Sequence, residues 1–413
     1  MSFDAPHEPR RPTSGEAPFG FGETFYSRTD GRGVILAGNE VFRRVADYGW
    51  DRLMGAPHRL IRHPDMPKGV FWLLWNRIQA GKSTGAYVKN LARDGLHYWV
   101  YAILTPVEGG YLSVRIKPSS SLFTRVQPLY AEALGREEAG LAPAESAARL
   151  LDDIEHSGFA DYDEFMATAL FNEIAARSIA LGGQPPERGA HIAEMHSLLR
   201  KALRLKHDLL RAFGEIRSIP TNLHIVASRL EVYGGPVSTI AENYRLMSTE
   251  VMRRLEEITD NSNGTGIGSQ LQNTVSSALF HTASSLVIGE VERDYRVDQA
   301  APGMDGAVEA GYLHTLDADY RREALAGLGA VSRAARALST ASEDLKRLLL
   351  GLDSIRVLCR VEAGRLAIGS GGLQAIIATL DRFHADVGEK LDTILDLSRR
   401  IRGAAESAVA SGS

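Results

Sequence analysis

The sequence predicts an α+β domain followed by an all-α bundle of two long antiparallel helical hairpins. Residues 21–117 carry β-branched and aromatic runs separated by turn residues. After residue 118 these runs disappear, and apolar residues recur every three or four positions. The chain has 413 residues, too many for one typical core, so two or three domains are expected.

Strands are expected at the end of the α+β domain. The aromatic and β-branched runs at 98–107 and 109–118 are joined by a Glu-Gly-Gly turn, which predicts a hairpin. Asp94-Gly95 is a second turn signal and adds a third antiparallel strand before the hairpin. Short helices should precede these strands, and Asn39 is a plausible cap for one of them.

The helical half is expected to form a four-helix bundle, because its seams step by threes and fours like those of coiled coils. The seam of the first long helix is Met195, Leu199, Ala202, Lys206, Leu209, Phe213, Ile216, Pro220, Leu223, Ala227 and Leu230. The next helices carry Val237, Ile240, Tyr244, Met247, Val251, Leu255 and Ile258, then Leu373, Ile376, Leu380, Phe383, Val387, Leu391 and Ile394. Lys206 and Pro220 are the expected weak points of the first helix.

The two hairpins are predicted to be internal repeats. Arg229 and Glu231 precede glycines and a heptad helix, and Arg360 and Glu362 do the same in the second hairpin. The alternative is that leucine-rich amphipathic helices simply look alike. The expected domains are a disordered lead-in at 1–20, the α+β domain at 21–118, a helical linker at 119–188, hairpins at 189–300 and 313–402, and a disordered tail at 403–413.

Composition favours a cytoplasmic protein. The net charge is −4, from 47 Lys+Arg against 51 Asp+Glu, so neither nucleic acid nor an anionic membrane is an expected partner. The single cysteine, Cys359, excludes an intrachain disulfide and fits a reducing compartment. No apolar run approaches the roughly 18 residues that span a bilayer, and residues 1–20 lack the apolar stretch of a signal peptide.

The segment "HRLIRHPDMP" at 58–67 is predicted to form the wall of a ligand pocket. His58 and His63 lie five residues apart, which does not place two metal ligands on one helix face, and no cysteine pair completes a metal site. No nucleophile with an orienting partner is apparent, so no catalytic residue and no enzyme activity are expected. The glycine cluster at 263–271 is expected to be an interhelix loop and not an ATP-binding lid.

The stretch from Phe25 to Val107 resembles the PAS domain of the bacterial aerotaxis-receptor family. The motifs "SRTD", "RHPDMP", "VKN" and "HYWV" occur in the family's order and spacing. The resemblance implies a PAS sensor domain that holds FAD without a covalent bond and reports redox state or oxygen, in aerotaxis or chemotaxis. The implied FAD-binding residues are Arg62, His63, Asp65, Trp75 and Asn90.

The chain departs from this family at Ser83 and Thr84, where many relatives carry a proline and an aromatic residue. The missing ring removes an apolar face from the expected pocket, so weaker flavin retention is expected. A different small molecule, haem on His58 or His63, or a purely protein-docking PAS domain are the alternatives.

The stretch "TNLHIVASRLEVYGG" resembles a degenerate copy of the tip of chemoreceptor signalling hairpins, with Thr221, Asn222, Leu223 and Glu231 in the family's order. The resemblance implies signalling protein partners at the helical bundle, and a homo-oligomer is expected. The alternative is a generic bundle without a kinase-docking tip, in a non-enzymatic scaffold protein.

Overall fold

The computed structural model describes residues 11–230, 235–258, 267–297, 304–365 and 371–411, which divide into two compact units. Unit 1 contains the residues up to Ala190 together with Ser276–Ala326. Unit 2 contains His191–Val275 and Gly327–Ser413. Three long helices, α7 (Glu187–Glu215), α10 (Ile267–Val297) and α11 (Gly306–Arg365), contribute residues to both units.

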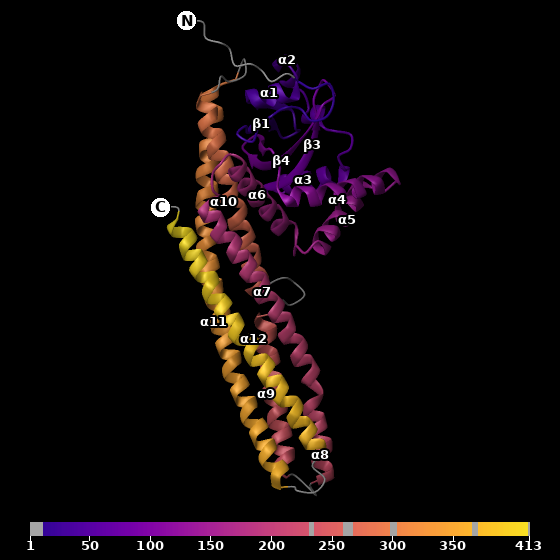
Figure 1. The fold of residues 1–413 in the computed structure, drawn as a ribbon, viewed down its shortest axis with the longest axis vertical. Coiled ribbons are helices and arrows are strands. Elements are labelled where there is room, and N and C mark those ends of the chain that lie inside the picture. The colour runs from indigo at the N-terminus through magenta and orange to yellow at the C-terminus, as the bar shows by residue number, and fades with distance from the viewer. Residues whose placement is uncertain (1–10, 231–234, 259–266, 298–303, 366–370, 412–413) are drawn as a thin grey trace. The chain divides into compact units, whose positions relative to one another are not determined.

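Unit 1 is built on a five-stranded antiparallel sheet in the order β2-β1-β5-β4-β3, which confirms the predicted α+β domain. Strands β1, β3 and β4 are labelled in Figure 1. Its strands are β1 (Phe25–Asp30), β2 (Ile35–Gly38), β3 (Thr84–Leu91), β4 (His97–Val107) and β5 (Gly110–Ile116). The predicted hairpin and the turn before it are both present. Gly95 and Gly109 take left-handed backbone angles, with φ of 89° and 79°, that glycine adopts without strain.

Short helices link the second and third strands. They are α1 (Glu40–Ala46), α2 (Trp50–Leu53), the 3₁₀ helix η1 (His58–Ile61) and α3 (Lys68–Gln79). As predicted, Asn39 caps α1, because its side-chain oxygen accepts a hydrogen bond from the backbone N–H of Phe42 at 3.1 Å.

The expected helical linker is part of unit 1. Residues 119–188 form α4 (Ser121–Glu138), α5 (Pro143–His156) and α6 (Tyr162–Ala180), with α7 beginning at Glu187. Helix α6 packs on the sheet, where the Tyr87 hydroxyl donates to Glu173 at 2.7 Å and the Tyr101 hydroxyl to the Met166 carbonyl at 2.6 Å. This segment was predicted to be a linker because the sheet residues to which it hydrogen-bonds are more than 60 positions away in the sequence.

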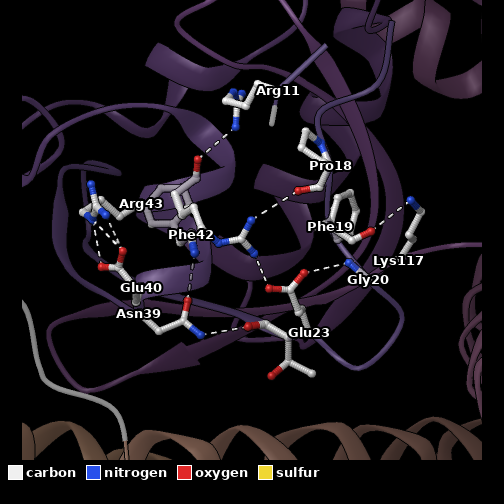
Figure 2. Close-up of polar contacts among 12 residues, drawn as sticks. Arg11, Pro18, Phe19, Gly20, Glu23, Asn39, Glu40, Phe42, Arg43 and Lys117 are labelled. Atoms are coloured by element: carbon white, nitrogen blue, oxygen red, sulfur yellow. Dashed lines mark hydrogen bonds and ion pairs between the residues drawn. The ribbon is translucent and has the colours of Figure 1, made fainter. Parts of the chain in front are cut away.

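Residues 11–20, expected to be disordered, lie against the sheet domain (Figure 2). Arg11 donates to the Arg44 carbonyl at 3.1 Å and pairs with Asp94 at 2.6 Å. Lys117 donates to the Phe19 carbonyl at 3.1 Å, and the Phe19 ring is buried. The lead-in prediction is therefore wrong for these ten residues, because long-range contacts offset their polar, proline-rich composition. Residues 1–10 lie outside the described part.

Unit 2 is a helical bundle in which most of the described seam residues are buried. The side chains of Ala227, Leu230 and Ile258 lie outside the described part. Its helices include α7, α8 (Ile219–Leu230), α9 (Pro236–Ile258), the second half of α11 and α12 (Gly371–Ala410) (Figure 1). The pairs Lys346–Asp392 and Arg356–Asp381 show that α11 and α12 run antiparallel, since one sequence number rises as the other falls. The Phe213 and Phe383 rings meet edge to face at 4.8 Å and join the two hairpins in one core.

Pro220 interrupts the first long helix as its weak-point prediction implied. Ile216–Ser218 form a 3₁₀ turn, η2, between α7 and α8. Proline offers no N–H and its ring conflicts with the carbonyl four residues earlier, so an unbroken α-helix is disfavoured there. Lys206 is buried at its seam position, beside Gly268 of α10.

The hairpin boundaries differ from those predicted. The first hairpin ends with α9 at Ile258, and α10 is an additional helix whose residues from Ser276 belong to unit 1. Helix α11 begins at Gly306, not 313, and its residues up to Ala326 also belong to unit 1. The repeat prediction rests on Glu231 and on the Arg229 side chain, which lie outside the described residues, so it stays a prediction. Residues 263–266 of the glycine cluster at 263–271 also lie outside them, and residues 267–271 form the first turn of α10.

The expected disordered tail at 403–413 is wrong up to residue 410. Helix α12 continues to Ala410, and the side chains of Ala404, Ala405 and Ala408 are buried. Small alanines allow close helix packing while showing little apolar contrast in the sequence, which is why the predicted seam ended at Ile394 and the predicted hairpin at 402.

Phe383→Ala should destabilise the bundle by about 3–5 kcal/mol, because it leaves a cavity where the Phe213 ring packs. The measurement is urea unfolding followed by far-UV circular dichroism. Leu246→Ala is the matched control: Leu246 is 53% exposed, so a change within about 0.5 kcal/mol is expected. A Phe383→Ala effect as small as that of the control would contradict this core assignment.

Candidate functional site

A cavity of about 390 Å³ lies on one face of the sheet, within the usual range for small-molecule sites. The sheet forms one wall, and α3 with the segment around η1 forms the other. Its main lining residues are Ser27 and Thr29 of β1, Val88 and Asn90 of β3, Ala102 and Leu104 of β4, Tyr111, Ser113 and Arg115 of β5, Phe71, Leu74, Trp75 and Ile78 of α3, and Pro57, His58, Arg59 and Arg62.

The period of two along each strand decides which side chains enter the cavity. Ser27 pairs across the sheet with Ser113, and Thr29 with Tyr111, so these residues share the cavity face. Tyr26 and Arg28 alternate with them and therefore point to the opposite face.

Arg115 brings a positive charge into the cavity wall without a carboxylate to balance it. The residue is 3% exposed, and its Nη2 lies 2.7 Å from the Ser27 hydroxyl and 2.7 Å from Nε2 of His58. Burial lowers the pKa of Arg115 to about 10. Burial, followed by repulsion from Arg115 and Arg62, lowers the pKa of His58 to about 3, so His58 is neutral and accepts from the guanidinium.

Four buried polar atoms around the cavity have no hydrogen-bond partner within the described structure. They are Nε of Arg62, Nδ2 of Asn90, Oγ of Ser113 and Nη1 of Arg115. Buried polar groups are almost always paired, because an unpaired one costs about 1–3 kcal/mol. Their concentration around one cavity indicates that a polar ligand or water satisfies them. None of the lining residues is acidic, and Arg32, Arg59, Arg62 and Arg115 are basic.

Aromatic rings close the other side of the cavity. The Arg62 guanidinium lies 3.5 Å from the centre of the Phe71 ring, and the Trp75 and Tyr111 rings meet edge to face at 5.5 Å. Gly33 makes room for Trp75: a Cβ at that position would lie 3.1 Å from the indole, and φ of 78° also favours glycine there.

Three of the five predicted ligand residues line the cavity. Arg62 and Asn90 are neighbours, joined by a short antiparallel bridge, and Trp75 projects from α3. His63 and Asp65 do not line it. Asp65 has 55% of its side chain exposed and accepts from Nζ of Lys89 at 2.6 Å. Lys89 alternates with Val88 and Asn90 along β3, so its side chain does not face the cavity, and Asp65, which pairs with it, lies outside. His63 and Asp65 were expected to point into the pocket, and neither is among the lining residues.

The cavity residues Ser113, Arg115 and His58 were not singled out from the sequence as flavin contacts. The available signal was the alternation of Tyr111, Ser113 and Arg115 in the second hairpin strand, which puts polar groups on a face expected to be apolar. Thr84 lies outside the cavity lining. It is fully buried, with its hydroxyl 3.9 Å from Sδ of Met166, so α6 occupies the surroundings of the missing aromatic residue.

Comparison with known proteins supports the sheet domain's assignment. The chain is 37% identical over 123 residues to the aerotaxis receptor of Escherichia coli K12, covering 29% of this chain and 24% of the receptor. The sheet domain is a PAS domain. A second relative, the bacterioopsin transcriptional activator of Halobacterium salinarum, is 28% identical over 92 residues, 22% of this chain and 13% of the activator. The chain thus spans a quarter or less of either relative, and no protein-family model matches it.

Solved structures were also compared with the chain. A PAS domain of a protein from Colwellia psychrerythraea is 19% identical, covers 23% of this chain and 85% of its own, and gives a TM-score of 0.20. A blue-light activated histidine kinase of Erythrobacter litoralis EL346 is 14% identical, covers 57% of this chain and 71% of its own, and gives a TM-score of 0.24. Scores this low carry no argument about function. In the described residues no helix is long and apolar enough to cross a membrane. That this chain binds no metal, has no catalytic residues and is not an enzyme stays a prediction.

Lowering the pH should destabilise the PAS domain through His58. Because its pKa falls from 6.5 to about 3 on folding, only the unfolded chain binds this proton as the pH drops below 6.5, and folding stability is lost from there toward pH 3. Between pH 7 and pH 5 the wild type should lose about 2 kcal/mol more than His58→Gln. Urea unfolding followed by tryptophan fluorescence measures this, since all four tryptophans lie between residues 50 and 99. Identical losses in both proteins would remove His58 as the cause.

Proposed function

We propose that this chain is a signal-transduction sensor whose PAS domain binds a flavin nucleotide and passes its redox state to the helical bundle. One observation carries the proposal: four unpaired polar atoms and four arginines, without any lining carboxylate, surround a cavity of about 390 Å³. The aerotaxis receptor to which 123 residues of this chain are 37% identical supports a role in oxygen or redox taxis.

The donor set fits FAD. Its phosphates carry negative charge, which the arginines of the cavity would neutralise, and guanidinium groups suit phosphate oxygens geometrically. Its flat ring system needs apolar and aromatic surfaces, which Trp75, Tyr111 and Leu74 offer, and polar ring edges, which Asn90 and Ser113 would meet. When bound, a flavin supplies reversible electron transfer. Arg62, Trp75, Asn90 and Arg115 would hold and orient it, and the surrounding apolar residues would limit access of water.

We propose that β1 transmits the state of the cavity to the opposite face of the sheet. Ser27 and Thr29 line the cavity, while Arg28 between them forms a two-pronged ion pair with Glu309 of α11, with Nε–Oε2 at 2.9 Å. The Tyr26 hydroxyl donates to the same carboxylate. The Glu309 side chain is only 4% exposed, so moving β1 by a fraction of an ångström would alter a charge-assisted contact that water does not screen.

Helix α11 would carry such a change onward. It runs without a break from Gly306 to Arg365, and a second contact to the sheet, between the hydroxyls of Thr105 and Tyr320 at 2.5 Å, lies three turns further along it. The predicted chemoreceptor-like tip at 221–235 lies outside the described residues at 231–234. Signalling partners there and a cytoplasmic location stay predictions, and a scaffold with a different ligand is the alternative.

Protein purified with flavin supplementation should show an oxidised-flavin absorbance spectrum that bleaches on reduction. Asn90→Ala should weaken flavin binding about tenfold or more, because it removes a buried donor at the ligand. Asp65→Ala is the matched control and should retain flavin, because Asp65 lies outside the cavity. Loss of flavin in Asp65→Ala but not in Asn90→Ala would contradict this cavity assignment and favour the sequence-based prediction that Asp65 contacts the flavin. A protein that stays colourless would exclude flavin and favour the alternative.

The second test concerns transmission. Hydrogen exchange should show amides 306–312 of α11 responding to flavin reduction in the wild type, and this response should disappear in Glu309→Gln, which removes the charge that Arg28 contacts. Asp319→Asn is the control, because Asp319 pairs with Arg322 at the exposed surface of the same helix. A response that persists in Glu309→Gln would show that the signal leaves the cavity by another route.

A further inference from the structure

Helix α11 presents an exposed apolar stripe on the side away from the bundle core. Four of the thirteen large apolar side chains exposed among the described residues lie within twelve residues of this helix: Leu350, Val357, Leu358 and Val361. Leu350 is 64% exposed, whereas Leu352 and Cys359 on the core side are fully buried. Scattered apolar residues on a surface are normal, but a cluster this dense on one helix marks an interaction surface.

Three members of the stripe have the spacing of a coiled-coil seam, which Ser354 completes. Leu350, Ser354, Val357 and Val361 follow each other by four, three and four residues, which places them on one line along the helix, and Leu358 flanks this line. At 100° per residue this line lies roughly opposite Leu352, so it is a second seam and not the edge of the first. Ser354, its one polar member, donates its hydroxyl to the Leu350 carbonyl at 3.2 Å, so burying it leaves no unpaired donor.

We propose that this stripe is a homodimer interface, in which α11 pairs antiparallel with α11 of a second copy of this chain. In that alignment Leu350 faces Val361 of the second copy, and Ser354 faces Val357, so every apolar member of the seam is covered. The pairing is related by a two-fold axis, so each contact occurs twice.

The charges beside the stripe decide the direction. Antiparallel pairing brings Asp353 beside Arg360 of the second copy and Asp344 beside Arg365, which are opposite charges. Parallel pairing brings Arg360 beside Arg365 of the second copy, which repel, and leaves Asp353 beside Leu358. In the monomer Arg360 pairs with Asp381 and Asp353 pairs with Arg356. The Arg360 side chain is 52% exposed and that of Asp353 38%, and solvent-exposed pairs contribute little, so exchanging partners costs little.

The dimer should be detected by light scattering after size-exclusion chromatography of the full chain at about 100 µM, because an interface of two heptads belongs to the small, transient class. Val357→Glu should abolish it by burying a charge in the seam, with unchanged circular dichroism. Leu246→Glu, an exposed leucine on α9, is the matched control and should leave the dimer intact. A monomeric wild type, or a dimer that survives both Val357→Glu and Leu350→Glu, would overturn the proposal.

Disulfide formation tests the direction of pairing. With Cys359→Ala removing the chain's one cysteine, Leu350→Cys and Val361→Cys variants are mixed and oxidised. Antiparallel pairing predicts mixed disulfides between the two variants, while parallel pairing predicts disulfides within each variant alone. Predominance of the latter would overturn the antiparallel arrangement. The result is independent of flavin binding, so it separates this proposal from the proposed function.

Discussion

A guanidinium group buried without a carboxylate shapes the PAS domain. Taking Arg115 out of water costs free energy, and within the described part of the chain its guanidinium makes polar contacts with a serine hydroxyl and a neutral histidine but with no carboxylate. Burial, together with repulsion from Arg115 and Arg62, keeps His58 unprotonated, and Nη1 of Arg115 at the cavity wall has no partner among the described residues. The domain therefore folds around a positive potential that its own residues do not cancel, and a negatively charged ligand would complete it.

The sheet uses its two faces for different purposes. One face and α3 enclose the cavity. The other face contacts α6 and α11 through buried hydroxyl and carboxylate groups, and α10 through the rings of Tyr26 and Tyr295. Alternation along β1 places these surfaces one residue apart, so no separate linker is needed between ligand and helix. Rigid β-pairing on both sides of β1 limits its motion to small displacements, which suits a contact as distance-dependent as a two-pronged ion pair.

Local patterns predicted the local structure well. The strands, their glycine turns and the Asn39 cap depend on neighbouring residues, and the heptad seams depend on spacing alone. The resemblance located Arg62, Trp75 and Asn90 in the cavity but also included His63 and Asp65, because motif order does not reveal which side of a bend a residue occupies. Contacts such as Tyr26 with Glu309, 283 residues apart, leave no mark in a local window. For this reason α6 was predicted to be part of a linker, and α10 and α11 were predicted to belong to the bundle alone.

The central claim is that uncompensated positive charge in the cavity selects an anionic ligand. The most direct measurement is a fluorescence titration of the full-length protein with FAD and with riboflavin, which shares the ring system but carries no phosphate. The account predicts that FAD binds at least about tenfold more tightly, since the arginines would neutralise its phosphates. Equal affinities, or tighter binding of riboflavin, would contradict it.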